Sequence, residues 1–222
     1  MKFANNHIFS QAMLDLKIIH VNENHKVAYA RVDYNIKNEL FNYLDRNLFN
    51  LDELLLMTNE KRKIEWMSVR YLISKVHNTP DDIIYNEHRK PFFTRSKSHL
   101  SISHSHEMIA ISIHESQVTG IDIQLISTKI ERIVSKFLRP KEIEECGQDS
   151  VKLTFYWSIK EALFKIYGRK DAYLKENFNV VNADFKDKWI AEGHIKTDNL
   201  DASYNLALLR IQNYTLAYVL NS

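Results

Sequence analysis

Hydrophobic residues return along this chain at two different spacings, so both helices and strands are predicted. In residues 51–76, apolar positions such as Met67 and Tyr71 recur near the 3.6-residue period, and neither Pro nor Gly interrupts the segment. Residues 151–167 have the same helical character and are followed by Gly168, a common C-terminal stop. Each of these two segments is therefore predicted to form a long helix.

Alternation of apolar and polar residues predicts strands in both halves of the chain. In residues 101–114, Ile109, Ile111 and Ile113 occupy every second position, which is typical of a strand or a hairpin. Residues 121–126 alternate in the same way. The remaining predictions are strands within residues 83–93, 178–185, 188–197 and 204–222, and helical structure in residues 129–146 that is broken at Pro140.

A helix followed by strands occurs twice along the sequence. In the first helix Trp66 lies four residues before Arg70, and in the second Trp157 lies four residues before Glu161. This repeated order of a helix followed by strands indicates a weak internal repeat and an α+β fold class.

Composition narrows the class of protein. Of the 222 residues 45% are hydrophobic and 11% aromatic, which is typical of a folded globular protein. A net charge of +2 gives little attraction for nucleic acid, although residues 61–70 are locally basic. The single Cys146 allows no internal disulfide, and no apolar run approaches the roughly 18 residues that span a bilayer. We expect no nucleic-acid or membrane partner and a cytoplasmic location.

Two patterns of charge point to chemistry. Asp122 and Gln124 project from the same side of a strand otherwise made of Ile and Leu, where a buried carboxylate needs a partner or a cation. In the helix of residues 151–167, Glu161 and Lys165 lie one turn apart, and a surface ion pair would also explain this spacing. Mg²⁺ is often held by one or two carboxylates completed by phosphate and water oxygens, and Asp122 with Glu161 would supply that pair.

The segment SHLSISHSH, residues 98–106, concentrates serine and histidine in nine positions. In an extended strand, His104 and His106 would point to one side, and Ser103 and Ser105 to the other. Two histidines at this spacing without a nearby cysteine or third ligand do not favour zinc. A nucleophile with its base and a strand that happens to be polar are the other possibilities for this segment.

Taken together, the motifs resemble those of 4′-phosphopantetheinyl transferases of the surfactin type. GIDIQ (residues 120–124), WSIKEALFK (157–165), SISHS (101–105) and Lys90-Pro91 occur in the order and rough spacing of that family. The combination of G-x-D-x-[EQ] with W-x-x-K-E-A-x-x-K is specific, and the similarity extends over most of the chain.

The resemblance implies a magnesium-dependent enzyme that transfers the 4′-phosphopantetheine arm of coenzyme A to a serine of an apo acyl or peptidyl carrier protein, releasing adenosine 3′,5′-bisphosphate. It implies two similar α+β halves related by a pseudo-twofold: residues 1–118 on the nucleotide side, and residues 119–222 with the magnesium and catalytic motifs. A single chain would complete the cleft, so a monomer is expected. The carrier protein would dock near Phe137, Leu138 and Lys141.

Individual roles follow from the same resemblance. Asp122 and Glu161 would bind magnesium with Gln124 beside them, and Glu161 would also accept the proton of the incoming serine. Lys165 would steady the diphosphate and the departing bisphosphate. Contacts with coenzyme A are implied for Lys61, Arg62, Arg70, Lys90, Ser103, His104 and Lys165.

Gln124 departs from the family pattern, since many relatives have Glu at this position. The amide removes one negative charge from the implied metal site. A noncatalytic module that binds coenzyme A or a nucleotide, with a degraded metal site, is therefore the alternative. Retention of Asp122, Lys160, Glu161 and Lys165 favours the enzyme.

Overall fold

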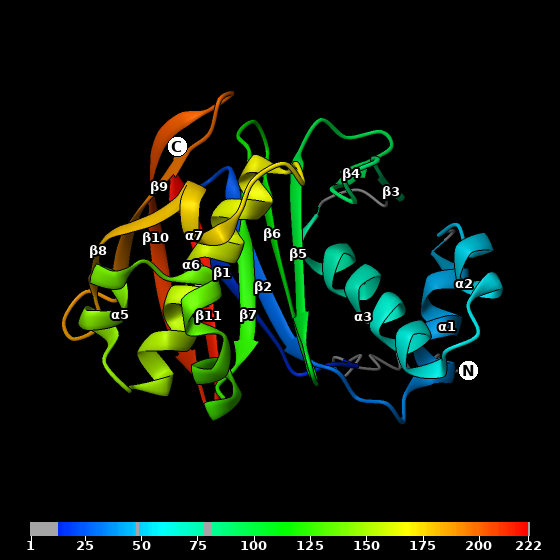
Figure 1. Cartoon of the computed structure of the whole chain (residues 1–222). Helices are drawn as coiled ribbons and strands as arrows, with labels where there is room; N and C mark the ends of the chain where they lie inside the picture. Colours follow the sequence, from blue (N-terminus) through cyan, green and yellow to red (C-terminus); the bar gives the residue numbers. More distant parts are fainter. Residues whose placement is uncertain (1–12, 48, 78–80, 222) are drawn as a thin grey trace, which may run out of the picture.

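The computed structural model describes residues 13–47, 49–77 and 81–221, and these residues form two antiparallel sheets with helices packed on them (Figure 1). The first sheet has the strand order β1-β2-β6-β5-β4-β3. Its strands are β1 (Leu16–His20), β2 (His25–Arg31), β3 (Ile83–Tyr85), β4 (Pro91–Phe93), β5 (His99–Ser105) and β6 (Met108–His114).

The second sheet is built entirely from the C-terminal part of the chain, in the order β7-β11-β10-β9-β8. Its strands are β7 (Ile121–Leu125), β8 (Phe178–Asp184), β9 (Ile190–Lys196), β10 (Asp201–Ile211) and β11 (Tyr214–Asn221). The strands predicted from alternation in residues 101–114 and 121–126 are confirmed, the former as the β5–β6 hairpin.

Two long helices, α3 (Glu60–Val76) and α6 (Ser150–Tyr167), cover the sheets. The shorter helices are α1 (Lys37–Arg46), α2 (Asp52–Leu56), α4 (Val134–Phe137), α5 (Pro140–Cys146) and α7 (Leu174–Asn177). Helix α6 matches its prediction: the Asp149 carboxylate caps its start by accepting from Val151 N–H and Lys152 N–H, and Gly168 ends it with φ 69°. Helix α5 begins at Pro140, where a break was predicted.

The prediction of one continuous helix over residues 51–76 is wrong. Met57 and Asn59 have extended backbones, and they separate α2 from α3. The physical reason is a cap: the Asn59 side chain accepts a hydrogen bond from Arg62 N–H at 3.1 Å and starts a new helix. Residues 58–63 are all polar and contain neither Pro nor Gly, so no helix-breaking residue marks the break in the sequence.

The molecule has four layers, in the order α3, first sheet, second sheet, α6. One apolar cluster joins α3 to the first sheet, and a second joins α6 to the second sheet. A third cluster lies between the sheets and includes Val27, Ala110, Ile121, Ile123 and Leu216. The predicted α+β fold with two halves is confirmed, while a domain division between residues 118 and 119 stays a prediction.

The serines of β5 connect the first sheet to β7, the edge strand of the second sheet. Three hydroxyl oxygens accept hydrogen bonds from backbone N–H groups of β7 at 3.1–3.2 Å: Ser101 from Ile121, Ser103 from Ile123, and Ser105 from Leu125. The opposite orientations predicted for Ser103 and His104 are confirmed, because Ser103 is buried and His104 exposed. His106 lies beyond β5 in the turn with φ 54°, so its predicted place in an extended strand is wrong.

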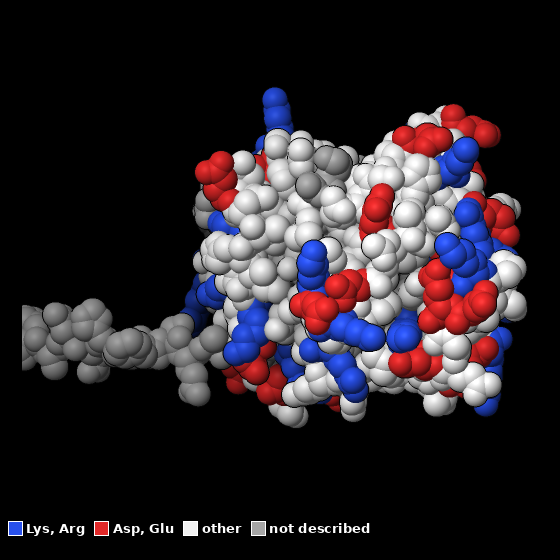
Figure 2. Space-filling model, turned by 90° about the vertical axis from the view of Figure 1, so that its left-hand side faces the viewer, with Lys and Arg blue, Asp and Glu red and all other residues white. Residues whose placement is uncertain are grey.

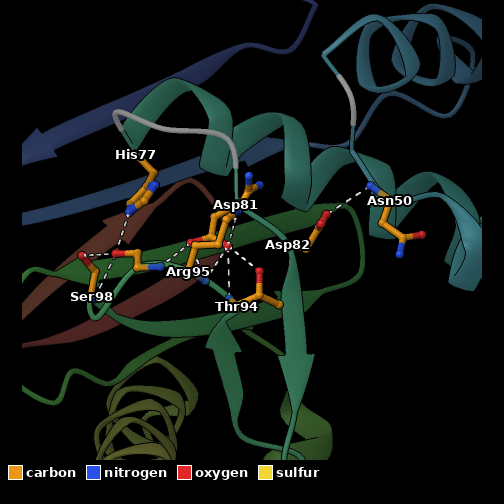
Figure 3. A network of polar contacts seen from close by, with 8 residues as sticks. Asn50, His77, Asp81, Asp82, Thr94, Arg95 and Ser98 are labelled. Atoms are coloured by element: carbon orange, nitrogen blue, oxygen red, sulfur yellow. Dashed lines mark hydrogen bonds and ion pairs between the residues drawn. The ribbon is translucent and has the colours of Figure 1, made fainter.

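Asp81 closes the base of the β3–β4 hairpin (Figure 3). Its buried carboxylate accepts hydrogen bonds from Thr94 Oγ1 at 2.8 Å and from Ser96 N–H at 2.7 Å. Burial alone would raise the pKa of Asp81, but hydrogen bonds from Ser96 and Thr94 outweigh it and lower the pKa. The hairpin is thereby held in place, with Arg89 and Lys90 at its far end.

The surface carries both signs of charge. Lys and Arg side chains alternate with Asp and Glu over the face in Figure 2, in keeping with the net charge of +2. Among the described helices none has the length and apolarity to cross a bilayer.

His25 is expected to make the protein sensitive to acid. It is 1% exposed, its Nε2 is 2.8 Å from Ser112 Oγ, and burial together with the nearby His114 lowers its pKa to about 4. The unfolded chain binds this proton at the ordinary pKa of 6.5, so stability is complete above pH 6.5 and falls as the pH drops toward 4, by about 3 kcal/mol.

Urea unfolding of wild type and His25→Gln at pH 7 and pH 4.5 measures this contribution. The variant is expected to lose less stability between the two pH values than wild type. Equal losses would show that other groups, such as His114, cause the acid sensitivity.

Candidate active site

Strand β7 and helix α6 bring the two acidic residues of the motifs together. On β7, Ile121 and Ile123 pack into the core between the sheets, so Asp122 projects to the opposite face, toward α6. Gly120 permits this close approach, since a Cβ atom there would lie 2.1 Å from the Ala162 carbonyl oxygen. The glycine of GIDIQ is thus required by helix–strand packing.

The carboxylate of Asp122 is buried, and only one of its two oxygens accepts hydrogen bonds from the described residues. Its Oδ1 accepts hydrogen bonds from Lys165 Nζ at 2.9 Å and from Ser103 Oγ at 2.8 Å, and Lys165 Nζ also donates to the Ile121 carbonyl oxygen at 2.7 Å. Its Oδ2 is buried and has no hydrogen-bond partner among the described residues. A buried carboxylate oxygen without a donor is costly unless something else binds it.

Glu161 has an environment suited to a base. Burial and, second, the negative charge of Asp122 raise the pKa of its carboxyl to about 7, although the Lys165 ammonium lowers it. The two carboxylates are therefore close enough to repel each other. A carboxyl with a pKa near the working pH can take up and release protons efficiently.

The donor set fits a hard divalent cation. Two adjacent carboxylates, one with an unpartnered oxygen, are what Mg²⁺ prefers, and water and phosphate oxygens usually complete its shell. Gln124, two residues along β7, is half-buried and projects to the same face as Asp122. The described residues contain no group of three or more His, Cys, Asp or Glu side chains that could bind a metal, so a cation here would depend on other ligands as well.

A pocket of about 200 Å³ opens beside these acids, between the two halves. Its lining includes Glu161, Lys165, Lys90 and Arg89. Lys90 Nζ donates to the Ile166 carbonyl oxygen at 2.9 Å, and burial lowers the pKa of this ammonium. Cations from both halves therefore line the pocket that Glu161 also lines.

A second pocket, of about 730 Å³, collects the residues of the predicted nucleotide side. Arg62, Arg70 and His104 line it. The Arg70 guanidinium lies 3.3 Å above the Trp66 ring and 3.4 Å from Glu53 Oε2, and burial lowers its pKa to about 10. At neutral pH it keeps its charge, at a pocket that Arg62, Arg89 and His104 also line.

The structure separates the basic residues at the start of α3. Arg62 lines the larger pocket, whereas Lys61 Nζ is 3.9 Å from Glu65 Oε1 and Lys63 Nζ is 3.0 Å from Glu60 Oε1. The surface ion pair of Lys61 with Glu65 therefore competes with the predicted contact between Lys61 and coenzyme A. The predicted contact of Ser103 also competes with its hydrogen bond to Asp122.

Arg89 was missed by sequence reasoning. It lines both pockets, together with Ile102, and so lies where they meet. The only signal in the sequence is its position next to Lys90 in the basic run His88-Arg89-Lys90.

A comparison with protein families matches the C-terminal part of the chain. The sequence model of the 4′-phosphopantetheinyl transferase superfamily matches residues 119–219, which contain Asp122, Glu161 and Lys165. A search of curated proteins finds no match. The matched residues build the second sheet and helix α6, and their similarity supports the 4′-phosphopantetheinyl transferase family.

Proposed function

We propose that this protein is a holo-[carrier-protein] synthase, which uses Mg²⁺ to transfer the 4′-phosphopantetheine arm of coenzyme A to a serine of an apo acyl or peptidyl carrier protein. The superfamily match supports a phosphopantetheinyl transferase. The observation that carries the specific reaction is the acidic pair: Glu161 with a pKa of about 7 faces Asp122 beside a pocket lined by cations from both halves.

In the proposed reaction the serine Oγ of the carrier protein attacks the phosphorus atom that bears the pantetheine arm. The new Oγ–P bond forms as the bridging P–O bond of the diphosphate breaks, and adenosine 3′,5′-bisphosphate leaves. Glu161 takes the serine proton, because its raised pKa makes it basic enough near neutral pH. A bound Mg²⁺ would neutralise charge on the diphosphate, and Asp122 and Glu161, with Gln124 nearby, would hold it.

Cationic side chains have the remaining roles. Lys165 Nζ, fixed by Asp122 Oδ1 and the Ile121 carbonyl oxygen, is held ready to offset charge on the leaving bisphosphate. Arg62, Arg70 and His104 suit a phosphate of the nucleotide, and Lys90 would lie near the same ligand. For Lys61 and Ser103, contacts with coenzyme A stay a prediction from the family resemblance.

The decisive experiment incubates the protein with coenzyme A, Mg²⁺ and an apo carrier protein, and follows the carrier by mass spectrometry. A gain of about 340 Da, the mass of the transferred arm, is expected on its serine and is expected to disappear when EDTA removes Mg²⁺. Binding of coenzyme A without any transfer would instead support a noncatalytic binding module.

The Gln124→Glu substitution is expected to lower the magnesium concentration that gives half-maximal rate. A third carboxylate on the face of β7 that carries Asp122 would strengthen the attraction for the cation. Rates measured across a magnesium titration test this. An unchanged midpoint would show that position 124 does not contribute to metal binding.

A further inference from the structure

The turn that connects β3 to β4 holds Arg89 in an unusual backbone conformation. Its φ is 65°, a left-handed value that glycine adopts freely and arginine rarely does. Asn86 fixes the turn: its carbonyl oxygen accepts from Arg89 N–H at 2.9 Å, and its side-chain Oδ1 accepts from Lys90 N–H at 2.8 Å. The backbone at Arg89 is thus constrained, and a glycine would be the least strained residue there.

The position of Arg89 at two pockets explains why this site has an arginine and not a glycine. It lines the larger pocket, with Arg62, Arg70 and His104, and also the smaller pocket beside Glu161. Residues held in sparsely populated backbone regions often serve ligand binding, where the surrounding structure maintains the strain. The side chain at this junction can reach a ligand that extends from one pocket to the other.

Arg89 is also available, unlike Lys90, Arg70 and Lys165. Lys90 Nζ donates to the Ile166 carbonyl oxygen, Arg70 to Glu53, and Lys165 to Asp122. The Arg89 guanidinium is exposed and makes no hydrogen bond or ion pair within the described part of the chain. Its five N–H donors are therefore free for a ligand that carries several phosphate oxygens.

We infer that Arg89 binds a phosphate group of coenzyme A where the two pockets meet, and that its strained backbone is retained for this contact. The inference rests on the proposed function, which supplies the ligand. A planar guanidinium binds phosphate through two parallel hydrogen bonds, and lysine cannot reproduce that geometry.

Calorimetric titration of coenzyme A in the presence of Mg²⁺, without a carrier protein, tests the inference. Arg89→Gly is expected to weaken binding about ten- to a hundredfold, the range for one charge-assisted hydrogen bond to phosphate, without lowering the thermal midpoint of the free protein. Arg89→Lys should give a smaller loss, since it keeps the charge. Arg89→Asn, which tolerates a left-handed backbone, should bind as weakly as Arg89→Gly.

Gln212→Gly is the matched control, because Gln212 has φ 53° in the exposed turn between β10 and β11 and lines neither pocket. It should bind coenzyme A like wild type. If Arg89→Gly and Arg89→Asn bind within about twofold of wild type, while wild type binds well, the role of Arg89 is refuted and the proposed function stands. If wild type itself binds no coenzyme A, both are wrong.

Discussion

Glu161→Gln is expected to lower kcat about 10²- to 10⁴-fold while making the free protein more stable at pH 8. The amide cannot take the proton of the attacking serine, and it has one negative charge fewer to hold a cation. Removal of this negative charge also ends the repulsion between Glu161 and Asp122, which together with burial raises the pKa of Glu161 to about 7. Loss of activity and gain of stability should therefore occur together.

The pH dependence of the stability gain follows from the direction of this shift. In the unfolded chain Glu161 ionises near its ordinary pKa of 4.5, whereas the folded protein keeps the proton until about pH 7. Wild type therefore loses stability as the pH rises from 4.5 to 7, by at most about 3 kcal/mol, and regains none above pH 7. The side-chain amide of the Glu161→Gln variant does not titrate, so the variant escapes this loss.

Urea unfolding at pH 5 and pH 8, without Mg²⁺ or coenzyme A, measures the stability, and the carrier-labelling assay measures kcat. Glu144→Gln, an exposed substitution on α5, is the matched control and should change neither quantity. A stability gain of equal size at both pH values would contradict a raised pKa. Labelling by Glu161→Gln at the wild-type rate would remove Glu161 from the catalytic mechanism.

Sequence periodicity predicted the parts of the fold that depend on local signals. Helix α6 is one example, because its apolar pattern and its terminal Gly168 agree with each other. The face of β7 that carries Asp122 is another, since alternation alone assigns it. The break before α3 was missed, because a cap by the Asn59 side chain produces it and neither Pro nor Gly marks it in the sequence.

Contacts between distant segments were beyond the sequence. The hydrogen bond from Ser103 to Asp122 joins strands of different sheets, and no spacing rule indicates it. The two pockets likewise form from separate parts of the chain, so the position of Arg89 between them could not be predicted from the adjacent residues in the sequence. The acidic pair was predictable because both of its members lie on elements with clear periodicity.

Lys160 is another residue whose partners only the structure reveals. Its ammonium is fully buried, and it donates to Glu142 Oε2 at 2.7 Å, to the Phe137 carbonyl oxygen at 2.8 Å and to the Leu174 carbonyl oxygen at 3.3 Å. Glu142 Oε1 in turn accepts from Val180 N–H at 3.0 Å. This pair therefore ties α4, α5, α7 and β8 to the residue that precedes Glu161 on α6.

Lys160→Met is expected to destabilise the protein by about 3–5 kcal/mol, because it leaves the Glu142 carboxylate buried without its ammonium. The double variant Lys160→Met/Glu142→Gln should be more stable than Lys160→Met alone, since the introduced amide is neutral and keeps an oxygen that can accept from Val180 N–H. Urea unfolding of the single and double variants gives the coupling free energy of the pair.

Lys141→Met is the matched control for stability alone, because within the described residues Lys141 forms an exposed ion pair, 3.8 Å from Glu145, whose loss should cost less than about 1 kcal/mol. Near-equal stability of Lys160→Met and Lys141→Met would contradict the structural role of the buried pair.

The Lys160→Met substitution should also affect the reaction with the carrier protein. The carrier protein is predicted to dock near Phe137, and this variant loses the hydrogen bond from Lys160 to the Phe137 carbonyl oxygen. In a Lys160→Met protein that still folds, the KM for the carrier should therefore rise more than the KM for coenzyme A.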